Sequence, residues 1–423
     1  MSAALSPPPV SLLRMAFRAA LGAVHGERLV SAHLSDVPLV GPHRLVALGK
    51  AATAMASGAL ATAGASITRA LVIGKPGPCI LPPALMQRDR VLFLTGDHPR
   101  PGVASLRAGA TLLRFLDECP PEESLLFLLS GGGSSLVEAP SQGLSLEDLG
   151  RINDWLLASG MDIHSINPIR GCFSRIKAGR LIHRVAGHAV RQCLLSDVRG
   201  HDPALIASGP LCPGADALPQ AQWPVWMAQL ARDHPAPPRP GEACFQGVQT
   251  RVLAGVEQAL AGAEAALRAR GVTVFNYGAR LRGDAARNGH DLGEWLRREA
   301  LPGVHLWGGE TTVTLPESPG RGGRARHLAL AAALALDGLP AGECVLLSAG
   351  SDGDDGPEAG EDPVAGAWVD GTTAGRVRQG GWDPQAALAQ ADSARALAVA
   401  GAEIRTGCTG TNVADLVLAW KRG

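Results

Sequence analysis

The sequence predicts a two-domain α/β protein in which helices cover a mostly parallel sheet. Short apolar runs that end in glycine alternate with long Ala-, Leu- and Arg-rich segments of helical period, and this alternation is typical of repeated βαβ units. The chain has 423 residues, whereas a single hydrophobic core rarely serves more than about 250 to 300 residues. Its content of 46% hydrophobic and 18% charged residues is that of a folded globular protein.

Five apolar runs in the first half of the chain are expected to form strands, with helices between them. A helix is expected after Ser145, because Ser145 followed by Glu147 and Asp148 is a typical capped start. It should continue through Leu157 and stop near Gly160. The five strands are predicted at residues 44–48, 71–73, 91–95, 125–129 and 192–196.

Prolines crowd between positions 210 and 240, which is hard to reconcile with regular structure. We therefore place the domain boundary there, with one domain over residues 1–235 and the other over residues 245–423. The second domain is predicted to be another α/β unit. Its helices are expected at residues 256–270 and 326–336, and its strands at residues 272–276, 305–307, 311–315 and 344–348.

Charge and hydropathy argue against two classes of partner. Basic and acidic residues balance at 39 each, so no net field attracts nucleic acid or an anionic membrane. The longest apolar runs, such as residues 328–336, fall short of the ~20 residues needed to cross a bilayer. The proline-rich start at residues 6–10 lacks a basic region followed by an apolar one. We expect a cytoplasmic protein that binds small molecules, with no nucleic-acid or membrane partner.

The apolar run at residues 125–129 leads directly into a glycine-rich segment, which we call the triple-glycine turn. Successive glycines let backbone N–H groups converge on an anion, and flanking hydroxyls add donors. The segment is therefore either a phosphate cradle or a tight strand-to-helix turn. It matches neither the Walker sequence nor a dinucleotide fingerprint, because Leu136 stands where Gly or Ala is needed. The turn consists of Ser130, Gly131, Gly132, Gly133, Ser134 and Ser135.

Lys50 follows another predicted strand and Gly49, at the start of an Ala-rich segment. Only four of the 39 basic residues are lysines, so a lysine in such a setting is more specific than a generic positive charge. At the carboxyl end of a parallel strand it would point toward the ligand site of an open α/β sheet. The alternative is a surface lysine.

Three further segments carry candidate ligand groups. Asp352, Asp354 and Asp355 follow the last predicted strand, where they form either a magnesium site or a solvated acidic turn. Arg324 closes a glycine-rich segment and either contacts a phosphoryl group or lies in an exposed loop. Residues 406–415 are rich in Gly and Thr and are expected to begin a short helix. They either bind an anion or only cap that helix.

In order along the chain, these motifs resemble those of the glycerate 2-kinase family, whose members were often labelled hydroxypyruvate reductases. The resemblance covers nearly the whole chain. The motifs that carry it are Gly49-Lys-Ala-Ala52, His98-Pro-Arg-Pro101, Ser130-Gly-Gly-Gly-Ser-Ser135, Asn167-Pro-Ile-Arg170, Ser174-Arg-Ile-Lys177, Ser196-Asp-Val198, Ala207-Ser-Gly-Pro210, Gly308-Gly-Glu-Thr311, Gly320-Arg-Gly-Gly-Arg324, Asp352-Gly-Asp-Asp-Gly356 and Thr409-Gly-Thr-Asn412.

The resemblance implies a Rossmann-like amino-terminal domain with a parallel sheet, a smaller carboxyl-terminal α/β domain of the MOFRL type, and an active site in the cleft between them. ATP and Mg2+ are the implied cosubstrate and metal, and D-glycerate is the implied acceptor. Lys50 and Arg324 would be the catalytic pair. Asp197 or Asp352 would hold the metal or accept the hydroxyl proton. The implied nucleotide-binding groups are the triple-glycine turn, Lys177, Thr409 and Asn412.

The chain departs from the family pattern beside Arg324, where Ala325, Arg326 and His327 replace the usual Asn-Gln-Glu. His164 and His201 also stand where acidic residues are common. Two alternative functions are a hydroxypyruvate reductase that uses NAD(P)H, against which the missing dinucleotide fingerprint weighs, and a non-catalytic protein that binds nucleotides or sugar acids. For the oligomeric state, a homodimer is one alternative that the sequence leaves open.

Overall fold

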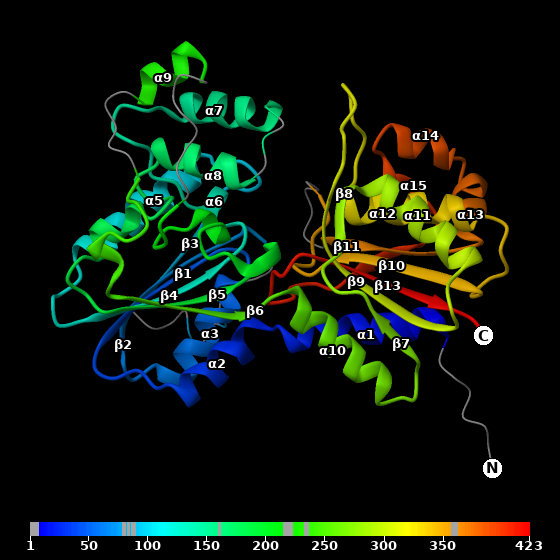
Figure 1. Cartoon of the computed structure of the whole chain (residues 1–423), viewed down its shortest axis with the longest axis horizontal. Helices are drawn as coiled ribbons and strands as arrows, with labels where there is room; N and C mark the ends of the chain where they lie inside the picture. The colour runs from blue at the N-terminus through cyan, green and yellow to red at the C-terminus, as the bar shows by residue number, and fades with distance from the viewer. Residues whose placement is uncertain are drawn as a thin grey trace. The chain divides into compact units, whose positions relative to one another are not determined.

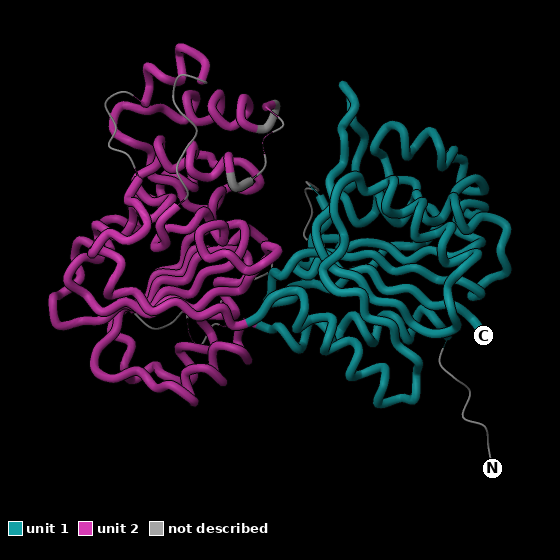
Figure 2. The backbone as a smooth tube through the Cα atoms, viewed as in Figure 1, with its two compact units in different colours: residues 1–25, 254–423 teal, residues 26–253 magenta. Residues whose placement is uncertain are grey.

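The computed structural model describes residues 8–77, 82, 85, 90–159, 161, 163–214, 223–231, 237–356 and 363–423. The chain forms two compact units (Figure 2), one of residues 26–253 and one of residues 1–25 with residues 254–423. We call them the parallel-sheet unit and the mixed-sheet unit. The sequence assigned the first 25 residues to the amino-terminal domain, whereas their helix packs with the mixed-sheet unit. The proposed boundary at residue 235 lies outside the described residues.

The parallel-sheet unit has six strands in the order β3-β2-β1-β4-β5-β6. β1 pairs in parallel with β2 and β4, and the pairs β2–β3 and β4–β5 are also parallel. The chain moves outward in opposite directions from β1 and β4, which makes their carboxyl ends the switch point of a doubly wound sheet. This confirms the expected Rossmann-like sheet. The strands are β1 (His43–Leu48), β2 (Ile67–Gly74), β3 (Val91–Thr95), β4 (Ser124–Ser130), β5 (Val190–Leu195) and β6 (Val248–Ala254).

Helices cover both faces of this sheet (Figure 1), which is why all six residues of β1 are buried. α2 (Gly26–Asp36) and α3 (Ala52–Ala63) lie on one face, and α5 (Val103–Asp117) lies on the other. α6 (Gly133–Leu136) is a single turn after β4. The described 3-10 helices of this unit are η1 (Arg180–Arg184), η2 (Arg199–His201), η3 (Ile206–Ser208) and η5 (Ala243–Phe245).

A separate apolar cluster joins α7 (Leu146–Ala158), α8 (Ile163–Cys172) and α9 (Val225–Ala231). Ser145 caps α7 as predicted, because the Asp148 N–H donates to Ser145 Oγ at 3.1 Å and the Ser145 N–H donates to the Asp148 carboxylate at 2.9 Å. The predicted stop at Gly160 lies outside the described residues. Phe173 and Trp223, whose ring centroids are 5.7 Å apart, anchor this cluster.

The mixed-sheet unit has strand order β12-β11-β10-β13-β9-β7, with β8 paired to β9. The expected second α/β unit is confirmed, and its sheet is mixed. Strands β10, β11, β12, β13 and β9 pair antiparallel, whereas β7 and β8 pair parallel to β9. Apolar runs report burial but not strand direction. The strands are β7 (Val274–Asn276), β8 (Leu281–Asp284), β9 (Gly303–Thr312), β10 (Cys344–Gly350), β11 (Val364–Asp370), β12 (Glu403–Arg405) and β13 (Asp415–Lys421).

Helices also cover both faces of the second sheet (Figure 1). On one face, α1 (Pro9–Ala23) packs closely on α10 (Val256–Arg268), since a Cβ at Gly262 would lie 2.5 Å from Ala23 Cβ. The other face carries α11 (Ala285–Arg298), α12 (Arg324–Leu336), α13 (Thr373–Gln379), α14 (Pro384–Ala389) and α15 (Ser393–Val399).

No helix in the described parts of the chain combines the length and apolarity needed to cross a bilayer.

Two local predictions in this unit are wrong. The expected strands at residues 305–307 and 311–315 are not separate: one strand, β9, continues through Gly308 and Gly309 and ends at Thr312, so residues 313–315 lie outside it. These glycines are required by close packing, because a Cβ at Gly308 would lie 2.2 Å from Val256 Cγ2 and one at Gly309 would lie 2.4 Å from the Leu281 oxygen. Residues 406–415 open no helix, and they lead instead into β13.

Candidate active site

Lys50 and the triple-glycine turn meet at the switch point of the parallel sheet. β1 ends at Leu48, β4 ends at Ser130, and the two strands are neighbours. The Lys50 N–H donates to the Gly131 oxygen at 3.0 Å, and the Ala51 N–H donates to Ser130 Oγ at 3.0 Å. The structure therefore brings together two motifs that lie about 80 residues apart in the sequence, as the order of strands in this type of sheet requires.

The glycines of this site permit close approach of backbone and side chains. Gly49 has φ +117°, and a Cβ there would lie 2.4 Å from the Ser130 oxygen. Gly132 has φ +82°, and a Cβ there would lie 2.8 Å from Lys50 Cγ, so the aliphatic part of Lys50 lies along Gly132. Both backbones are in a region that favours glycine. The segment is a tight strand-to-helix turn that also holds a lysine side chain, while phosphate binding stays a prediction.

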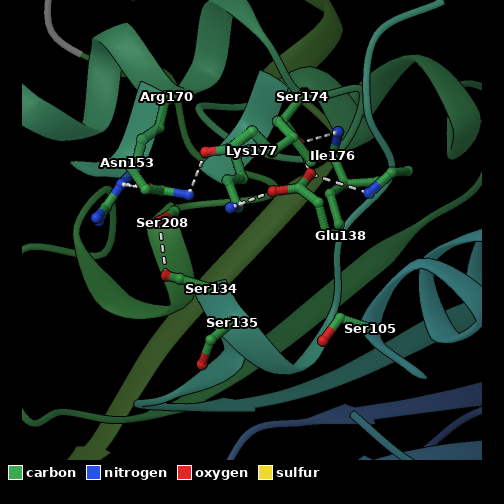
Figure 3. Close-up of polar contacts among 12 residues, drawn as sticks. Ser105, Ser134, Ser135, Glu138, Asn153, Arg170, Ser174, Ile176, Lys177 and Ser208 are labelled. Carbon is green, nitrogen blue, oxygen red and sulfur yellow. Dashed lines mark hydrogen bonds and ion pairs between the residues drawn. The ribbon is translucent and has the colours of Figure 1, made fainter. Parts of the chain in front are cut away.

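A second strained segment packs beside the triple-glycine turn. Ala207, Ser208 and Gly209 all have left-handed backbones, with φ of 51°, 61° and 54°. Non-glycine residues in this region are uncommon and are often found at functional sites. Ser208 Oγ lies 2.6 Å from Ser134 Oγ (Figure 3), and a Cβ at Gly133 would lie 2.7 Å from Ala207 Cβ. The segment therefore forms a wall of the turn.

Lys177, predicted to bind nucleotide, is buried in an ion pair. Its Nζ lies 2.5 Å from Glu138 Oε2, and both side chains are at most 5% exposed. The other oxygen of Glu138 accepts hydrogen bonds from Ser174 Oγ at 2.6 Å and from the Ala139 N–H at 2.9 Å (Figure 3). Lys177 also lines a cavity of about 10 Å³ with Gly133. A direct contact with nucleotide stays a prediction.

Asp197 comes from the same edge of the parallel sheet. β5 ends at Leu195, whose partner in β4 is Ser130, and Asp197 follows two residues later. The Ser196 hydroxyl donates to the Val198 oxygen at 3.0 Å and shapes the backbone around Asp197. The chain therefore leaves β5 beside the triple-glycine turn, which is where a residue acting on phosphate or metal is needed.

Arg324, the first residue of α12, is held by two carboxylates in the mixed-sheet unit. Its Nε and Nη2 donate to the two oxygens of Asp415 at 2.6 and 3.3 Å, and its Nη1 donates to Glu310. Burial lowers the pKa of Arg324, but the charges of Asp415 and Glu310 outweigh burial and raise the pKa above its usual value. Its side chain remains 35% exposed. The guanidinium is thus a fixed, permanently charged and accessible group.

The start of α12 is anchored by a buried ion pair between Arg326 and Asp355. The N–H groups of Ala325 and Arg326 donate to the Asp355 carboxylate at 2.8 and 2.9 Å, and Arg326 Nε donates to it at 3.0 Å. The two side chains are 1% and 3% exposed. Asp355 therefore caps the helix that carries Arg324, and it is not part of a solvated acidic turn.

Asp352 and Asp354 lie in the same turn, and a role in holding a metal stays a prediction for them. Asp352 Oδ1 accepts the Asp354 N–H at 3.2 Å, and Asp352 is close enough to Arg324 to raise the pKa of the guanidinium. Among the described residues, no three His, Cys, Asp or Glu side chains are arranged to hold a metal ion. Mg2+ usually binds one or two carboxylates together with substrate phosphates, so Asp352 fits that role only when a nucleotide is present.

Thr409 and Asn412 lie in the loop before β13 and are buried. Thr409 packs on the acidic turn, since a Cβ at Gly353 would lie 3.1 Å from Thr409 Cγ2. The Val413 N–H donates to Ser351 Oγ at 2.8 Å, which holds the loop along the same turn. These contacts are all within the protein, so binding of nucleotide by Thr409 and Asn412 stays a prediction.

The candidate residues thus form two groups. Lys50, the triple-glycine turn, Lys177 and Asp197 belong to the parallel-sheet unit, and Arg324, Asp352, Thr409 and Asn412 belong to the mixed-sheet unit. A shared interdomain site stays a prediction.

Two family models match the chain. One, described as "Domain of unknown function (DUF4147)", covers residues 12–234, and the MOFRL family covers residues 303–415. D-glycerate 2-kinase of Thermotoga maritima is 33% identical over 88% of this chain and 89% of that protein. A putative hydroxypyruvate reductase of Agrobacterium vitis is 33% identical over 96% and 93% of the two chains. The crystal structure of glycerate kinase from Thermotoga maritima has a TM-score of 0.79 at 31% identity, covering 98% of this chain and 100% of that one.

The chain belongs to the glycerate 2-kinase family. The resemblance read from the motifs is therefore confirmed. Among the positions that depart from the glycerate 2-kinase pattern, Arg326 is the buried partner of Asp355. His327 is 6% exposed, and burial lowers its pKa. The changes beside Arg324 thus alter the interior of α12 and leave the contacts of Arg324 in place.

Sequence reasoning missed three carboxylates that pair with the candidate site residues: Glu138, Glu310 and Asp415. Glu310 lies within the motif at residues 308–311, and Asp415 lies three residues after the motif at residues 409–412. Glu310 lies in one motif and Asp415 lies just after another, but their partner Arg324 is 14 and 91 residues away. Only the fold reveals such pairings.

Proposed function

We propose that this protein transfers the γ-phosphoryl group of ATP to the 2-hydroxyl of D-glycerate, giving 2-phosphoglycerate and ADP. The observation that carries the proposal is the contact of Lys50 with the triple-glycine turn at the switch point of a Rossmann-like sheet. Ligands of such sheets bind at this point. The acceptor is suggested by the relative named D-glycerate 2-kinase.

In this proposal, the parallel-sheet unit binds the phosphates. The glycine backbone of the triple-glycine turn lets phosphate oxygens approach N–H groups without interference from Cβ atoms. Lys50 supplies a compact ammonium beside that turn, and the hydroxyl of Ser134 is held in place by Ser208. These groups position the nucleotide before any bond changes.

The transfer itself requires charge stabilisation. The bond from the γ-phosphorus to the bridging oxygen breaks, a bond to the glycerate oxygen forms, and negative charge spreads over the other three phosphoryl oxygens. Lys50 and Arg324 stabilise this charge, and Asp415 keeps the guanidinium in a fixed orientation. The hydroxyl proton passes to Asp197 or Asp352. Positioning and electrostatics supply most of the rate enhancement in such reactions.

ATP and Mg2+ are the cosubstrate and metal of this proposal. When bound, Mg2+ neutralises phosphate charge, and Asp352 or Asp197 would hold it. The partners are then a nucleotide and a small hydroxy acid. A cytoplasmic location and a homodimer remain parts of the proposal that rest on sequence alone.

Phosphorus NMR of the protein with ATP, Mg2+ and D-glycerate tests the proposal. We expect 2-phosphoglycerate and ADP to accumulate together. The appearance of 3-phosphoglycerate would correct the acceptor hydroxyl. No phosphoglycerate, combined with NADH oxidation in the presence of hydroxypyruvate, would replace the kinase by a reductase.

A further inference from the structure

Arg170 is a guanidinium near the triple-glycine turn that the reaction scheme above does not use. It lies on α8 and is partly buried. Its Nε donates to Asn153 Oδ1 at 3.0 Å (Figure 3), and this amide is neutral. Within the described ranges, its side chain makes no other hydrogen bond and no ion pair at contact distance. Burial lowers the pKa of Arg170, and the charge of Glu138 offsets this only in part.

Glu138 is the carboxylate whose charge acts on Arg170, and it already has other partners. Glu138 bonds Lys177 Nζ at 2.5 Å, and its second oxygen accepts two further hydrogen bonds. Two cations therefore surround one carboxylate, which leaves one positive charge in excess in this cluster of Arg170, Lys177 and Glu138. Because the partner of the partly buried Arg170 in the described ranges is a neutral amide, an anion that binds here gains a charge interaction that is not yet used.

The fold connects this excess charge to the proposed phosphate site. Asn167 lies one helical turn before Arg170 on α8, so the two side chains are neighbours on its surface. Ser208 Oγ donates to Asn167 Oδ1 at 3.4 Å and also contacts Ser134 of the triple-glycine turn. A chain of polar groups therefore runs from the turn to Arg170.

The geometry points to Arg170 as the group that binds the carboxylate of the hydroxy-acid substrate. The two terminal nitrogens of a guanidinium match the two oxygens of a carboxylate, whereas Lys50 and the glycine backbone are suited to phosphate. A carboxylate held here, with its 2-hydroxyl directed along Asn167 and Ser208 toward Ser134, would be presented to the nucleotide phosphates. This assignment rests on the proposed kinase function and names its substrate-specificity residue.

Steady-state kinetics of Arg170→Gln test the assignment. Loss of a charge-assisted contact predicts a rise of roughly 10- to 100-fold in KM for D-glycerate, with KM for ATP within about twofold of the wild-type value. Arg170→Lys should fall between the two, because it keeps the charge without the planar fork. Wild-type preference for D-glycerate over glycerol, which has no carboxylate, should shrink by a similar factor in Arg170→Gln.

Two matched variants separate binding from packing. Asn153→Ala removes the hydrogen bond to Arg170 but keeps its charge, and Arg175→Gln removes an exposed guanidinium from the same segment. Both should leave KM for D-glycerate nearly unchanged. If Asn153→Ala reproduces the defect of Arg170→Gln, Arg170 acts through helix packing and the assignment is wrong. A rise confined to KM for ATP, or no change in either KM, overturns it as well.

Calorimetric titration of D-glycerate into the protein distinguishes failure of this assignment from failure of the kinase function. If the wild-type protein forms no phosphoglycerate but binds D-glycerate, and Arg170→Gln weakens that binding roughly 10-fold or more, the carboxylate site stands and the kinase function falls. If the wild-type protein forms phosphoglycerate and Arg170→Gln binds D-glycerate equally well, only the carboxylate site falls. Absence of both turnover and binding would overturn both.

Discussion

The turn after β4 and the start of α12 each position one of the two cations that we propose act on the phosphoryl group, but the two sites are built differently. At the triple-glycine turn, glycines with left-handed backbones let Lys50 lie against the chain. At the start of α12, side chains hold Arg324, since Asp415 and Glu310 contact it and Arg326 and Asp355 anchor its helix. Backbone shape defines the first site, and ion pairs define the second. Each design fails in its own way when a residue is changed.

The largest effect is expected from Arg326→Met. It leaves Asp355 buried without its ionic partner, and breaking a buried pair in this way costs about 3–5 kcal/mol of folding free energy. Arg378→Met, which breaks the exposed pair with Asp337, should cost far less, because solvent screens an exposed ion pair. Urea denaturation of the two variants measures both values. Arg326→Gln should cost less than Arg326→Met, because an amide can still donate to Asp355. Equal losses for Arg326→Met and Arg378→Met would contradict the anchoring role.

Lys50→Met tests the site that Lys50 forms with the triple-glycine turn. Removal of one preorganised charge contact to a transition state costs about 100- to 1000-fold in rate, or roughly 3–4 kcal/mol. We therefore expect ADP formation to be nearly abolished while the far-ultraviolet circular dichroism spectrum and the unfolding midpoint stay close to those of the wild type. Lys421→Met, at the end of β13, is the matched control and should keep its activity. An unchanged rate in Lys50→Met would remove this lysine from the mechanism.

The difference between the two sites also explains what the sequence could predict. Gly49, Lys50 and the triple-glycine turn follow apolar runs directly, so their place at strand ends and at one edge of a parallel sheet followed from local pattern. The partners of Arg324 and Arg326 come from β9, the acidic turn and β13, and no local pattern encodes those contacts. The acidic turn was accordingly interpreted as metal site or solvent loop, whereas its Asp355 is a helix cap.

Gly49→Ala should have a smaller effect than either change above. Its φ of +117° disfavours a side chain, and the new Cβ would meet the Ser130 backbone at 2.4 Å, so a cost of about 1–3 kcal/mol in stability is expected. Gly143→Ala is a useful comparison, because Gly143 also has a positive φ of 83° but has no atom within 4 Å of the place that a Cβ would take. Thermal unfolding of the two variants separates backbone strain from the contact with Ser130. Equal costs would show that the close approach of β1 and β4 contributes nothing.

Strand direction in the second sheet shows where sequence reasoning stops. The apolar runs at residues 305–307 and 344–348 were correctly placed in strands. Their antiparallel pairing through β13 depends on a segment whose start had been interpreted as a helix. Gly308 and Gly309 separate the two strands that the sequence predicts. In the fold they lie inside β9, where the lack of a Cβ atom makes room for Val256 and Leu281. A glycine pair in isolation does not distinguish a strand end from a close contact.

The last expected effect concerns the pH dependence of the Arg324 site, which Asp415 helps to build. Burial raises the pKa of Asp415 to about 6, although Arg324 opposes the shift. Because the folded state then binds this proton more tightly than the unfolded state, the contribution of Asp415 to stability is present at low pH and is lost as pH rises from about 4 to about 6. Stability of the wild type relative to Asp415→Asn should therefore fall across that window in urea titrations at stepped pH, by about 1.4 kcal/mol for each unit by which folding raises the pKa. A relative rise would mean that Arg324 outweighs burial and lowers the pKa of Asp415, making the ion pair a net stabilising contact.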